Sequence, residues 1–501
     1  MNVAMLLEMA AASFGDREAV RCGDRALGYA ALERAAHAAA HEIQSAGRRH
    51  AAVLDETSPA VPIALFGAAW AGVPFVPLSY RLTDAEVDAL VARIEPCHLV
   101  TDDARIARLG ERGARTLAPR DAWLARVADP ADVEAKPWPD DGDAIAILLF
   151  TSGTTGAPKA AVLRHRHLVS YVLGSVEFGG AGEDEATLVA VPPYHIAAMS
   201  AILSSVYAGR RIVQLPRFDA KEWIALAARE RVTHAFVVPT MLARIVDALA
   251  AAPVPLPALR ALAYGGGKMP LPVIERAMAL LPRVDFTNAY GLTETSSTVS
   301  LLGPDDHRAA HASVDAAVRR RLGSVGRALP GVEVEIRDAE GEPVAVGERG
   351  ERWVRGDQVA GEYLERGSQL REEGWFPTRD QGFVDADGFL FLEGRLDDVI
   401  VRGGENLSPG EIEDVLREHP AVADCAVVGV PDEQWGEAVA AVIVPRGAPP
   451  TADELREWVR ARLRSSRAPA RIEFRDALPY TETGKLLRRA VRAELVDAPP
   501  P

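Results

Sequence analysis

A short loop near residue 155 carries a high density of groups that can bind phosphate. The segment Thr151-Ser152-Gly153-Thr154-Thr155-Gly156-Ala157-Pro158-Lys159 follows an apolar run and combines two glycines, four hydroxyls and a lysine. Glycines let the backbone turn tightly and point N–H groups inward, and the hydroxyls and the ammonium add donors. A Walker motif needs four residues between its glycines, whereas only two separate Gly153 from Gly156. The pattern predicts an oligophosphate site of another type, with a polar surface loop as the alternative.

Lysine is rare in this chain, which makes the lysines that remain informative. Of 56 basic residues only five are lysine, namely Lys136, Lys159, Lys221, Lys268 and Lys485. A compact ammonium and a planar guanidinium are not interchangeable, so a lysine kept among arginines is a candidate for chemistry. Lys159 and Lys485 both lie in loops that contain glycine. These two are therefore the first candidates for contacts to phosphate.

The elements that must position these loops follow from apolar periodicity. Buried strands are predicted at 144–150, 187–191, 211–215 and 234–238, and helices at 84–94 and 219–231. This alternation predicts an α/β fold with helices packed on largely parallel sheets. From Val332 onward, short alternating runs predict a small antiparallel sheet or barrel. After Gly394 the pattern predicts a separate compact α+β unit with capping boxes at Ser408 and Thr451. We therefore expect domains at 1–394 and 395–501.

Composition excludes several classes of protein. The chain has 501 residues, is 48% apolar and carries a net charge of −15, which fits a globular protein and argues against a nucleic-acid binder. Three cysteines without paired spacing predict neither a disulfide framework nor a zinc cluster, and favour the cytoplasm. The uncharged stretch 57–80 contains four prolines and two glycines, so we expect a buried helix, a turn and a strand, with no transmembrane segment.

Five motifs in family order resemble those of the adenylate-forming superfamily, which comprises acyl-CoA synthetases, peptide-synthetase adenylation domains and firefly luciferases. The first is the loop Thr151–Lys159. The others are Tyr290-Gly291-Leu292-Thr293-Glu294, Asp380 after Trp375-Phe376-Pro377-Thr378-Arg379, Gly394-Arg395-Leu396-Asp397-Asp398, and Pro479-Tyr480-Thr481-Glu482-Thr483-Gly484-Lys485. The resemblance implies a large N-terminal domain of stacked sheets with a barrel-like subdomain, followed by a small mobile C-terminal domain.

The resemblance also implies roles for the matching residues. The ATP or AMP ligands would be Thr151, Ser152, Gly153, Thr154, Thr155, Gly156, Lys159, Gly265, Gly266, Asn288, Ala289, Tyr290, Gly291, Thr293, Asp380 and Arg395. The catalytic residues would be Lys485, Glu294 and Thr293, and the ligands of Mg²⁺ would be Glu294 and Thr155. The acyl group would contact His195, Met199 and Gly267. CoA would contact Arg402, Gly403 and Gly404, and the hinge would be Asp397.

The substrate acid is constrained by what this chain lacks. Peptide-synthetase adenylation domains carry an aspartate that holds the substrate amine, whereas this chain has His195 and no acidic residue between Leu188 and Gly209. An amino acid is therefore a poor candidate, and Ala197 with Ala198 leaves room for a bulky apolar acid. Val401 stands where luciferases and plant aryl-CoA ligases usually have lysine, which disfavours light chemistry.

Three departures from the family pattern are visible in the sequence. Arg379 replaces the glycine before the ribose aspartate, Ala160 replaces the glycine after Lys159, and Gly267-Lys268 replaces a small residue followed by proline. None of them removes a chemical group that the reaction needs, although Arg379 could narrow the nucleotide site or change its local charge.

The expected function is that of an ATP-dependent acid–thiol ligase. A hydrophobic carboxylate would attack the α-phosphate of MgATP to give an acyl-adenylate and pyrophosphate, and CoA would then displace AMP. Two alternatives stay open: an acyl-carrier protein as the acceptor, and a nucleotide-binding homologue without turnover. A homo-oligomer also stays open.

Overall fold

A computed structural model describes residues 1–110, 113–128, 137–151, 158–403, 405–432, 434–481 and 486–497. Two compact units divide the chain. The first consists of Met1–Leu322, Ala328–Glu333 and Arg355–Phe376, and the second of Gly323–Arg327, Val334–Val354 and Pro377–Pro501. The predicted boundary at residue 394 lies within the second unit and stays a prediction.

The predicted strands of the N-terminal half lie in two large sheets. The nine-stranded sheet has the order β15 (Arg327–Ala328), β14 (Ser297–Leu302), β13 (Asp285–Leu292), β12 (Ala261–Gly265), β11 (His234–Val237), β9 (Ala186–Val189), β10 (Arg211–Gln214), β1 (Glu18–Cys22), β2 (Arg25–Gly28). The eight-stranded sheet has the order β19 (Gly367–Ser368), β18 (Glu362–Tyr363), β8 (Lys159–Arg164), β7 (Ile145–Thr151), β4 (Phe75–Leu78), β3 (His50–Leu54), β5 (Cys97–Thr101), β6 (Arg115–Pro119).

Pairing in these sheets is largely parallel, as the alternation of strands and helices predicts. Antiparallel pairs occur at β1 with β2, β13 with β14, β7 with β8 and β18 with its two neighbours. Two of these antiparallel pairs, β7–β8 and β13–β14, flank segments that carry predicted site residues.

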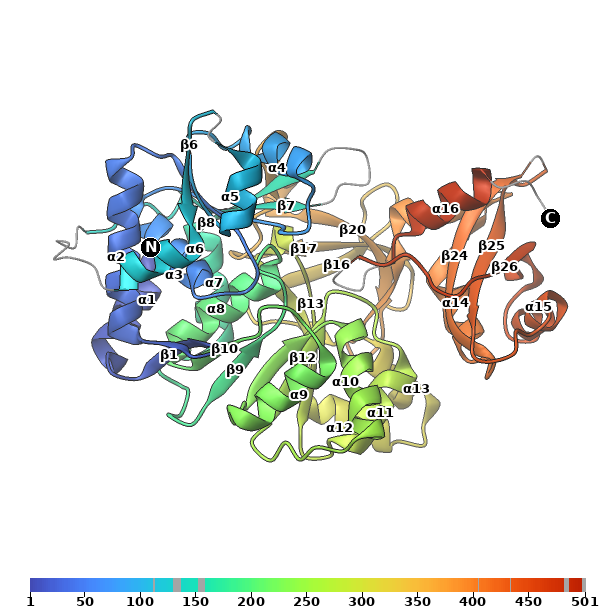
Figure 1. Cartoon of the computed structure of the whole chain (residues 1–501). Coiled ribbons are helices and arrows are strands. Elements are labelled where there is room, and N and C mark those ends of the chain that lie inside the picture. Colours follow the sequence, from blue (N-terminus) through green and yellow to red (C-terminus); the bar gives the residue numbers. More distant parts are fainter. Residues whose placement is uncertain are drawn as a thin grey trace. The chain divides into compact units, whose positions relative to one another are not determined.

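Helices cover the sheets of the first unit. They are α1 (Ala4–Phe14), α2 (Tyr29–Ser45), α3 (Ala60–Ala71), α4 (Asp84–Val91), α5 (Asp103–Leu109), α6 (Arg120–Ala128), α7 (His165–Ser175), α8 (Ile196–Ala208), α9 (Ala220–Arg229), α10 (Pro239–Ala251), α11 (Leu271–Leu280), α12 (Pro304–Ala312) and α13 (Ala316–Arg319). Helices α9, α10 and α11 lie beside β12 (Figure 1) and bury an apolar core with the nine-stranded sheet, with Trp223, Leu242 and Ile274 against Val237 and Leu262. A second core packs α1, α2, α3 and α8 together.

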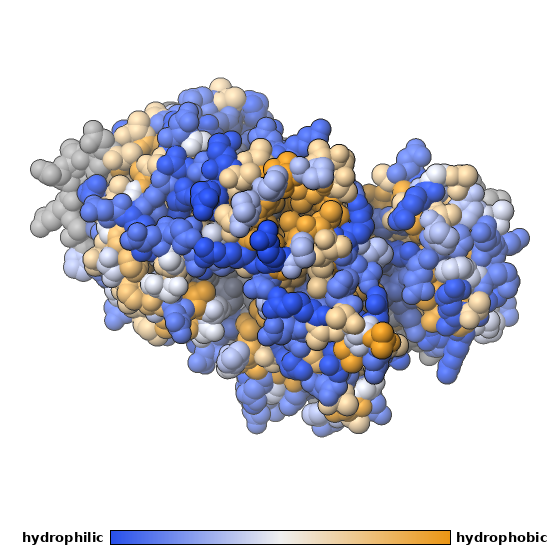
Figure 2. Space-filling view, turned by 90° about the horizontal axis from the view of Figure 1, so that it is seen from below, coloured by the Kyte–Doolittle hydropathy of each residue, from blue (hydrophilic) through white to orange (hydrophobic). Residues whose placement is uncertain are grey.

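The uncharged stretch 57–80 folds as the sequence predicts. It forms the buried helix α3, which ends at Gly72 in the left-handed conformation (φ 72°), and then the buried strand β4. Within the described residues, no helix is both long enough and apolar enough to cross a bilayer. The face shown in Figure 2 is mostly hydrophilic, with apolar residues gathered in smaller areas.

The second unit contains two smaller sheets. The four-stranded sheet has the order β16 (Glu333–Arg337), β17 (Gly350–Arg355), β20 (Phe376–Val384), β21 (Leu390–Arg395). The five-stranded sheet has the order β23 (Glu405–Leu407), β22 (Ile400–Arg402), β25 (Gly436–Pro445), β24 (Val422–Asp432), with β26 (Arg471–Phe474) parallel to β25. Helices α14 (Pro409–Arg417), α15 (Ala452–Arg460) and α16 (Arg488–Asp497) complete it.

Of the two predicted capping boxes, the one at Thr451 forms its first hydrogen bond and the one at Ser408 is wrong. The Thr451 hydroxyl accepts from the Glu454 amide at 3.1 Å, as predicted. Ser408 precedes α14 but makes no cap; its hydroxyl donates instead to the Glu393 carbonyl at 2.7 Å. A partner 15 residues away in sequence competes successfully for this hydroxyl, because the end of β21 lies within its reach.

Candidate functional site

The ends of the predicted phosphate loop are firmly held. Thr151 and Lys159 face each other across the β7–β8 ladder, and the Thr151 hydroxyl donates to the Lys159 carbonyl at 3.4 Å. The guanidinium of Arg93 donates to the Pro158 carbonyl at 2.7 Å and stacks on Phe150 at 4.7 Å from the ring centroid. The loop residues Ser152, Gly153, Thr154, Thr155 and Gly156 lie outside the described residues, as do Gly404 and Lys485.

Glu294 lies close to Lys159, although the two are far apart in sequence. Glu294 is in a short 3₁₀ turn (Thr293–Thr295) between β13 and β14. Its carboxylate accepts a hydrogen bond from the Tyr363 hydroxyl, and the Lys159 ammonium lies 5.5 Å from the centroid of the Tyr363 ring. Tyr363 thus joins two predicted site residues. Sequence reasoning missed it, because its only local signal is a two-residue strand.

The predicted adenine-binding residues lie along β12 and β13. These strands are parallel, with Gly265 beside Ala289. A Cβ on Gly265 would lie 2.1 Å from the Ala289 carbonyl oxygen, and one on Gly291 would lie 1.7 Å from the Ser297 carbonyl oxygen. Only glycine fits at these two positions, because the backbone of the neighbouring strand occupies the space that a Cβ would need.

Two of the three predicted acyl-binding residues lie at the start of α8, whereas Gly267 is exposed in the bend that follows β12. His195 is the N-cap of this helix, and Met199, one turn further on, is fully buried. A small hollow nearby is lined by Leu188, Val189, Val191, Ala197, Ala198, Ala201 and Phe236. Every lining side chain is a hydrocarbon. Ala197, Ala198 and Ala201 of α8 line it, and the acyl-binding roles of His195 and Met199 stay predictions.

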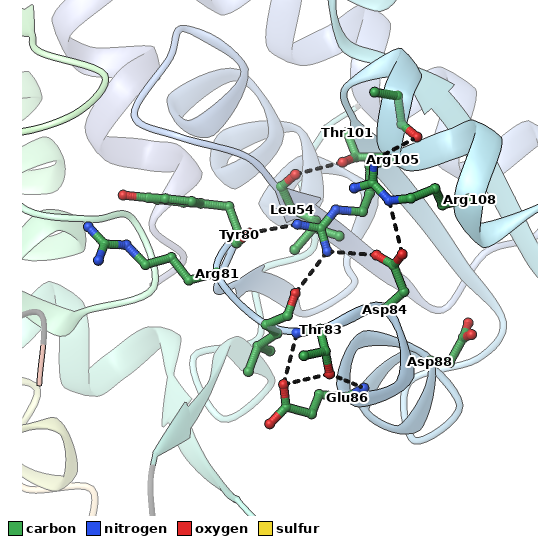
Figure 3. Close-up of polar contacts among 12 residues, drawn as sticks. Leu54, Tyr80, Arg81, Thr83, Asp84, Glu86, Asp88, Thr101, Arg105 and Arg108 are labelled. Carbon is green, nitrogen blue, oxygen red and sulfur yellow. Dashed lines mark hydrogen bonds and ion pairs between the residues drawn. The ribbon is translucent and has the colours of Figure 1, made fainter.

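The aromatic rings of Tyr80 and Tyr194 connect the loop before α4 to His195. Arg105 donates to the Tyr80 carbonyl at 2.7 Å and the Leu82 carbonyl at 2.9 Å, and pairs with Asp84 at 3.1 Å (Figure 3). The loop so held places the Tyr80 ring against Tyr194 (5.8 Å between centroids), which in turn lies 4.7 Å from His195. Tyr80 is a second neighbour of the site that the sequence did not reveal.

The imidazole of His195 is neutral at physiological pH. Burial lowers its pKa from 6.5 to about 4, and its Nε2 is buried without a hydrogen bond to any described residue. An aromatic neighbour and a neutral ring suit contact with an apolar group.

The pKa of His195 has a consequence for acid stability. Between pH 6.5 and 4 the unfolded chain binds a proton at this residue that the folded chain does not, so stability falls as pH falls through this window. We expect His195→Phe to lose less of its melting temperature between pH 7 and pH 5 than the unmodified protein, measured by calorimetry. His311→Gln, at an exposed histidine, is the control. An unchanged pH dependence in His195→Phe would contradict the burial of this imidazole.

The predicted ribose site lies in the second unit. Asp380 of β20 is 6% exposed and faces Arg395 of β21, with 3.3 Å between Oδ1 and Nη1. Arg379 adopts the left-handed conformation (φ 61°) that glycine favours, and its guanidinium pairs with Asp397 at 2.5 Å. The Arg379 guanidinium is thus paired with Asp397 in this arrangement.

The predicted CoA-contacting stretch packs against an aromatic ring. The Arg402 guanidinium lies 5.5 Å from the centroid of Trp435, and the Gly403 amide donates to the Trp435 carbonyl at 2.8 Å. A Cβ on Gly403, whose φ is 58°, would lie 2.7 Å from the Trp435 ring. Glycine is required here by the local packing of the chain itself.

Comparison with known proteins agrees with this arrangement. Residues 7–364 match the AMP-binding enzyme family, and residues 411–485 match its C-terminal domain. The chain belongs to the AMP-binding enzyme family. The predicted superfamily, its acyl-CoA synthetase branch and the α/β fold are confirmed, as is the reaction class of an AMP-forming acid–thiol ligase.

Individual relatives of this AMP-binding enzyme span its whole length. A feruloyl-CoA synthase of an Amycolatopsis species is 36% identical over 95% of both chains. A fatty acid–[acyl-carrier-protein] ligase of Streptomyces coeruleorubidus is 32% identical over 95% of this chain and 92% of its own. The o-succinylbenzoate CoA synthetase of Bacillus subtilis, solved with its acyl-adenylate, is 29% identical with a TM-score of 0.84, covering 99% of this chain and 98% of its own. It has also been solved with ATP and a magnesium ion.

Proposed function

We propose that this AMP-binding enzyme activates an aromatic carboxylic acid without an amine and transfers the acyl group to CoA. The observation that carries the proposal is the hydrocarbon-lined hollow beside the neutral His195. An ammonium group in such a site would lose its hydration without a carboxylate to pair with. The feruloyl and o-succinylbenzoate relatives support an aromatic acid, because each is named for one.

In the proposed mechanism the residues position groups and offset charge. Lys159 would bind the ATP phosphates, and Asp380 would accept hydrogen bonds from the ribose hydroxyls, with Arg395 beside it. Lys485 would stabilise the charge that develops as the carboxylate attacks the α-phosphate. The thiol of CoA would then attack the acyl carbon and release AMP.

Magnesium fits this site as an ion shared with the substrate. The described residues contain no group of three or more metal-binding side chains, but Glu294 presents a carboxylate at a tight turn near Lys159. Mg²⁺ is commonly held by one or two carboxylates together with substrate phosphates, and would neutralise phosphate charge there. Glu294 would hold it, with Thr155 of the phosphate loop.

The acid preference is tested by pyrophosphate release with a matched pair of acids. 3-Phenylpropanoic acid and phenylalanine differ only in the amine, and we expect the amine-free acid to have at least about tenfold higher kcat/KM, because the apolar pocket cannot hold an ammonium. Octanoic acid controls for hydrophobicity without a ring. A faster reaction with phenylalanine would refute the proposal, and a faster reaction with octanoic acid would refute its aromatic part.

The acceptor is tested in the second half-reaction. One relative is an acyl-carrier-protein ligase, so the second candidate acceptor is the pantetheine arm of a carrier protein. Both acceptors present the same thiol, so their rates of acyl transfer from a common acyl-adenylate can be compared directly. We expect free CoA to react faster.

We also propose a cytoplasmic location. The use of ATP and CoA and the three free cysteines fit this location.

A further inference from the structure

The turn that carries Glu294 is held from outside by one short segment. In this bridging segment, Gln358–Tyr363, the amides of Ala360 and Gly361 both donate to the Glu294 carbonyl at 2.9 Å. The Gln358 side-chain amide donates to the Thr295 carbonyl at 3.1 Å and to the Thr298 carbonyl at 2.7 Å. Backbone and side chain thus both fix the turn, and the Tyr363 hydroxyl then reaches the Glu294 carboxylate itself.

The bridging segment also belongs to the other sheet of the first unit. Tyr363 pairs with Ala161 of β8, two residues beyond Lys159, whereas Glu294 extends from the turn between β13 and β14. The ring of Tyr363 lies under the Lys159 ammonium at a distance at which cation–π attraction operates. One side chain therefore contacts the predicted metal ligand through its hydroxyl and the predicted phosphate ligand through its ring.

The direction of the hydrogen bond determines what Tyr363 can do. An ionised carboxylate only accepts, so the tyrosine hydroxyl donates and fixes the orientation of Glu294 while the remaining lone pairs stay open. Mutation of a partner that orients a metal ligand in this way typically lowers metal affinity or activity about 10–100-fold. The same arrangement restrains the long, flexible side chain of Lys159 before ATP arrives.

We propose that Tyr363 is a positioning residue that holds Glu294 for Mg²⁺ and Lys159 for the ATP phosphates. The proposal rests on the proposed roles of Glu294 and Lys159. It assigns to a residue of β18 the task of bringing groups from two sheets into one site.

Tyr363→Phe isolates the hydroxyl, because it keeps the ring over Lys159. We expect the Mg²⁺ concentration for half-maximal binding of a non-hydrolysable ATP analogue, measured by calorimetry, to rise about tenfold. Adenylation should show the same shift in Mg²⁺ dependence, while acyl transfer from supplied acyl-adenylate should stay unchanged. The matched control is Glu362→Gln, which breaks the neighbouring ion pair with Arg164 on the same strand.

A second variant separates this inference from the function on which it rests. Glu294→Gln should also shift the Mg²⁺ dependence, and the double variant should be little worse than the poorer single one, since both act through one carboxylate. If Glu294→Gln binds MgATP normally, the proposed metal ligand is wrong. If Glu294→Gln is impaired but Tyr363→Phe behaves like Glu362→Gln, Tyr363 is a packing residue and the inference is overturned.

Discussion

Lys485→Ala is expected to lower the rate of adenylation by about 10²–10³-fold, the typical cost of removing one preorganised donor from a developing oxyanion. The Lys485 ammonium would lie between the attacking carboxylate and the α-phosphate, where it would offset the negative charge that develops. Pyrophosphate release measures this step. Acyl transfer from supplied acyl-adenylate should be largely spared, because the α-phosphate is already bonded to the acyl group in that half-reaction.

The described residues on both sides of the segment 482–485 are anchored to the C-terminal sheet and helix. Tyr480 pairs with Leu486 across the segment, and the Tyr480 hydroxyl donates to Asp424 at 2.5 Å. Arg488 donates to both carboxylate oxygens of the buried Glu413 at 2.8 and 2.7 Å. The chain therefore enters and leaves the segment at anchored points.

Two further variants sharpen this test. Lys485→Arg should restore little activity, because a wide planar fork cannot replace a compact ammonium between two oxyanions. Lys221→Ala, at an exposed lysine on α9, is the control and should leave both half-reactions unchanged. If Lys485→Ala slows both half-reactions by the same factor, the lysine is structural.

Asp397→Pro is expected to slow thioester formation by up to about 10²-fold while it changes adenylation much less. Asp397 lies in a 3₁₀ turn (Leu396–Asp398) directly after β21, at the proposed pivot. A pivot must change φ and ψ between two arrangements, and proline fixes φ near −65°. A misplaced proline costs about 3 kcal/mol, which corresponds to about two powers of ten in rate. Single-turnover measurements of each half-reaction give the comparison.

The ion pair between Arg379 and Asp397 requires its own control. Asp397→Pro removes this pair and also fixes φ at residue 397, whereas Arg379→Ala removes the pair without placing a proline there. An exposed pair of this kind contributes about 0.2–1 kcal/mol, so Arg379→Ala should have a small effect on both steps. Equal slowing of both half-reactions by Asp397→Pro would show that Asp397 is not the hinge.

Much of the fold and of the site's chemistry could be predicted from local sequence. Apolar runs predicted β7, β9, β10 and β11 to within two residues, because burial of a strand depends on its own side chains. These are properties of a few adjacent residues.

Contacts between distant segments could not be predicted in the same way. Nothing around Ser408 indicates that its hydroxyl bonds to Glu393 and not to the helix that follows. Arg379 has a backbone conformation that glycine favours, and no residue beside it in the sequence indicates that it pairs with Asp397. Such choices depend on which strand ends lie side by side.

The sequence by itself determined the family, the reaction class and the chemical groups available, because loops with glycine, hydroxyls and a rare lysine encode those groups within a few residues. Only the tertiary structure decided that Glu294 and Lys159 both contact the side chain of Tyr363. Tyr363, 69 residues from Glu294, forms that connection by pairing with β8 while its hydroxyl reaches a turn of the other sheet. A short strand has almost no signal of its own, and its place is set by the packing of two sheets whose strands come from the whole first unit.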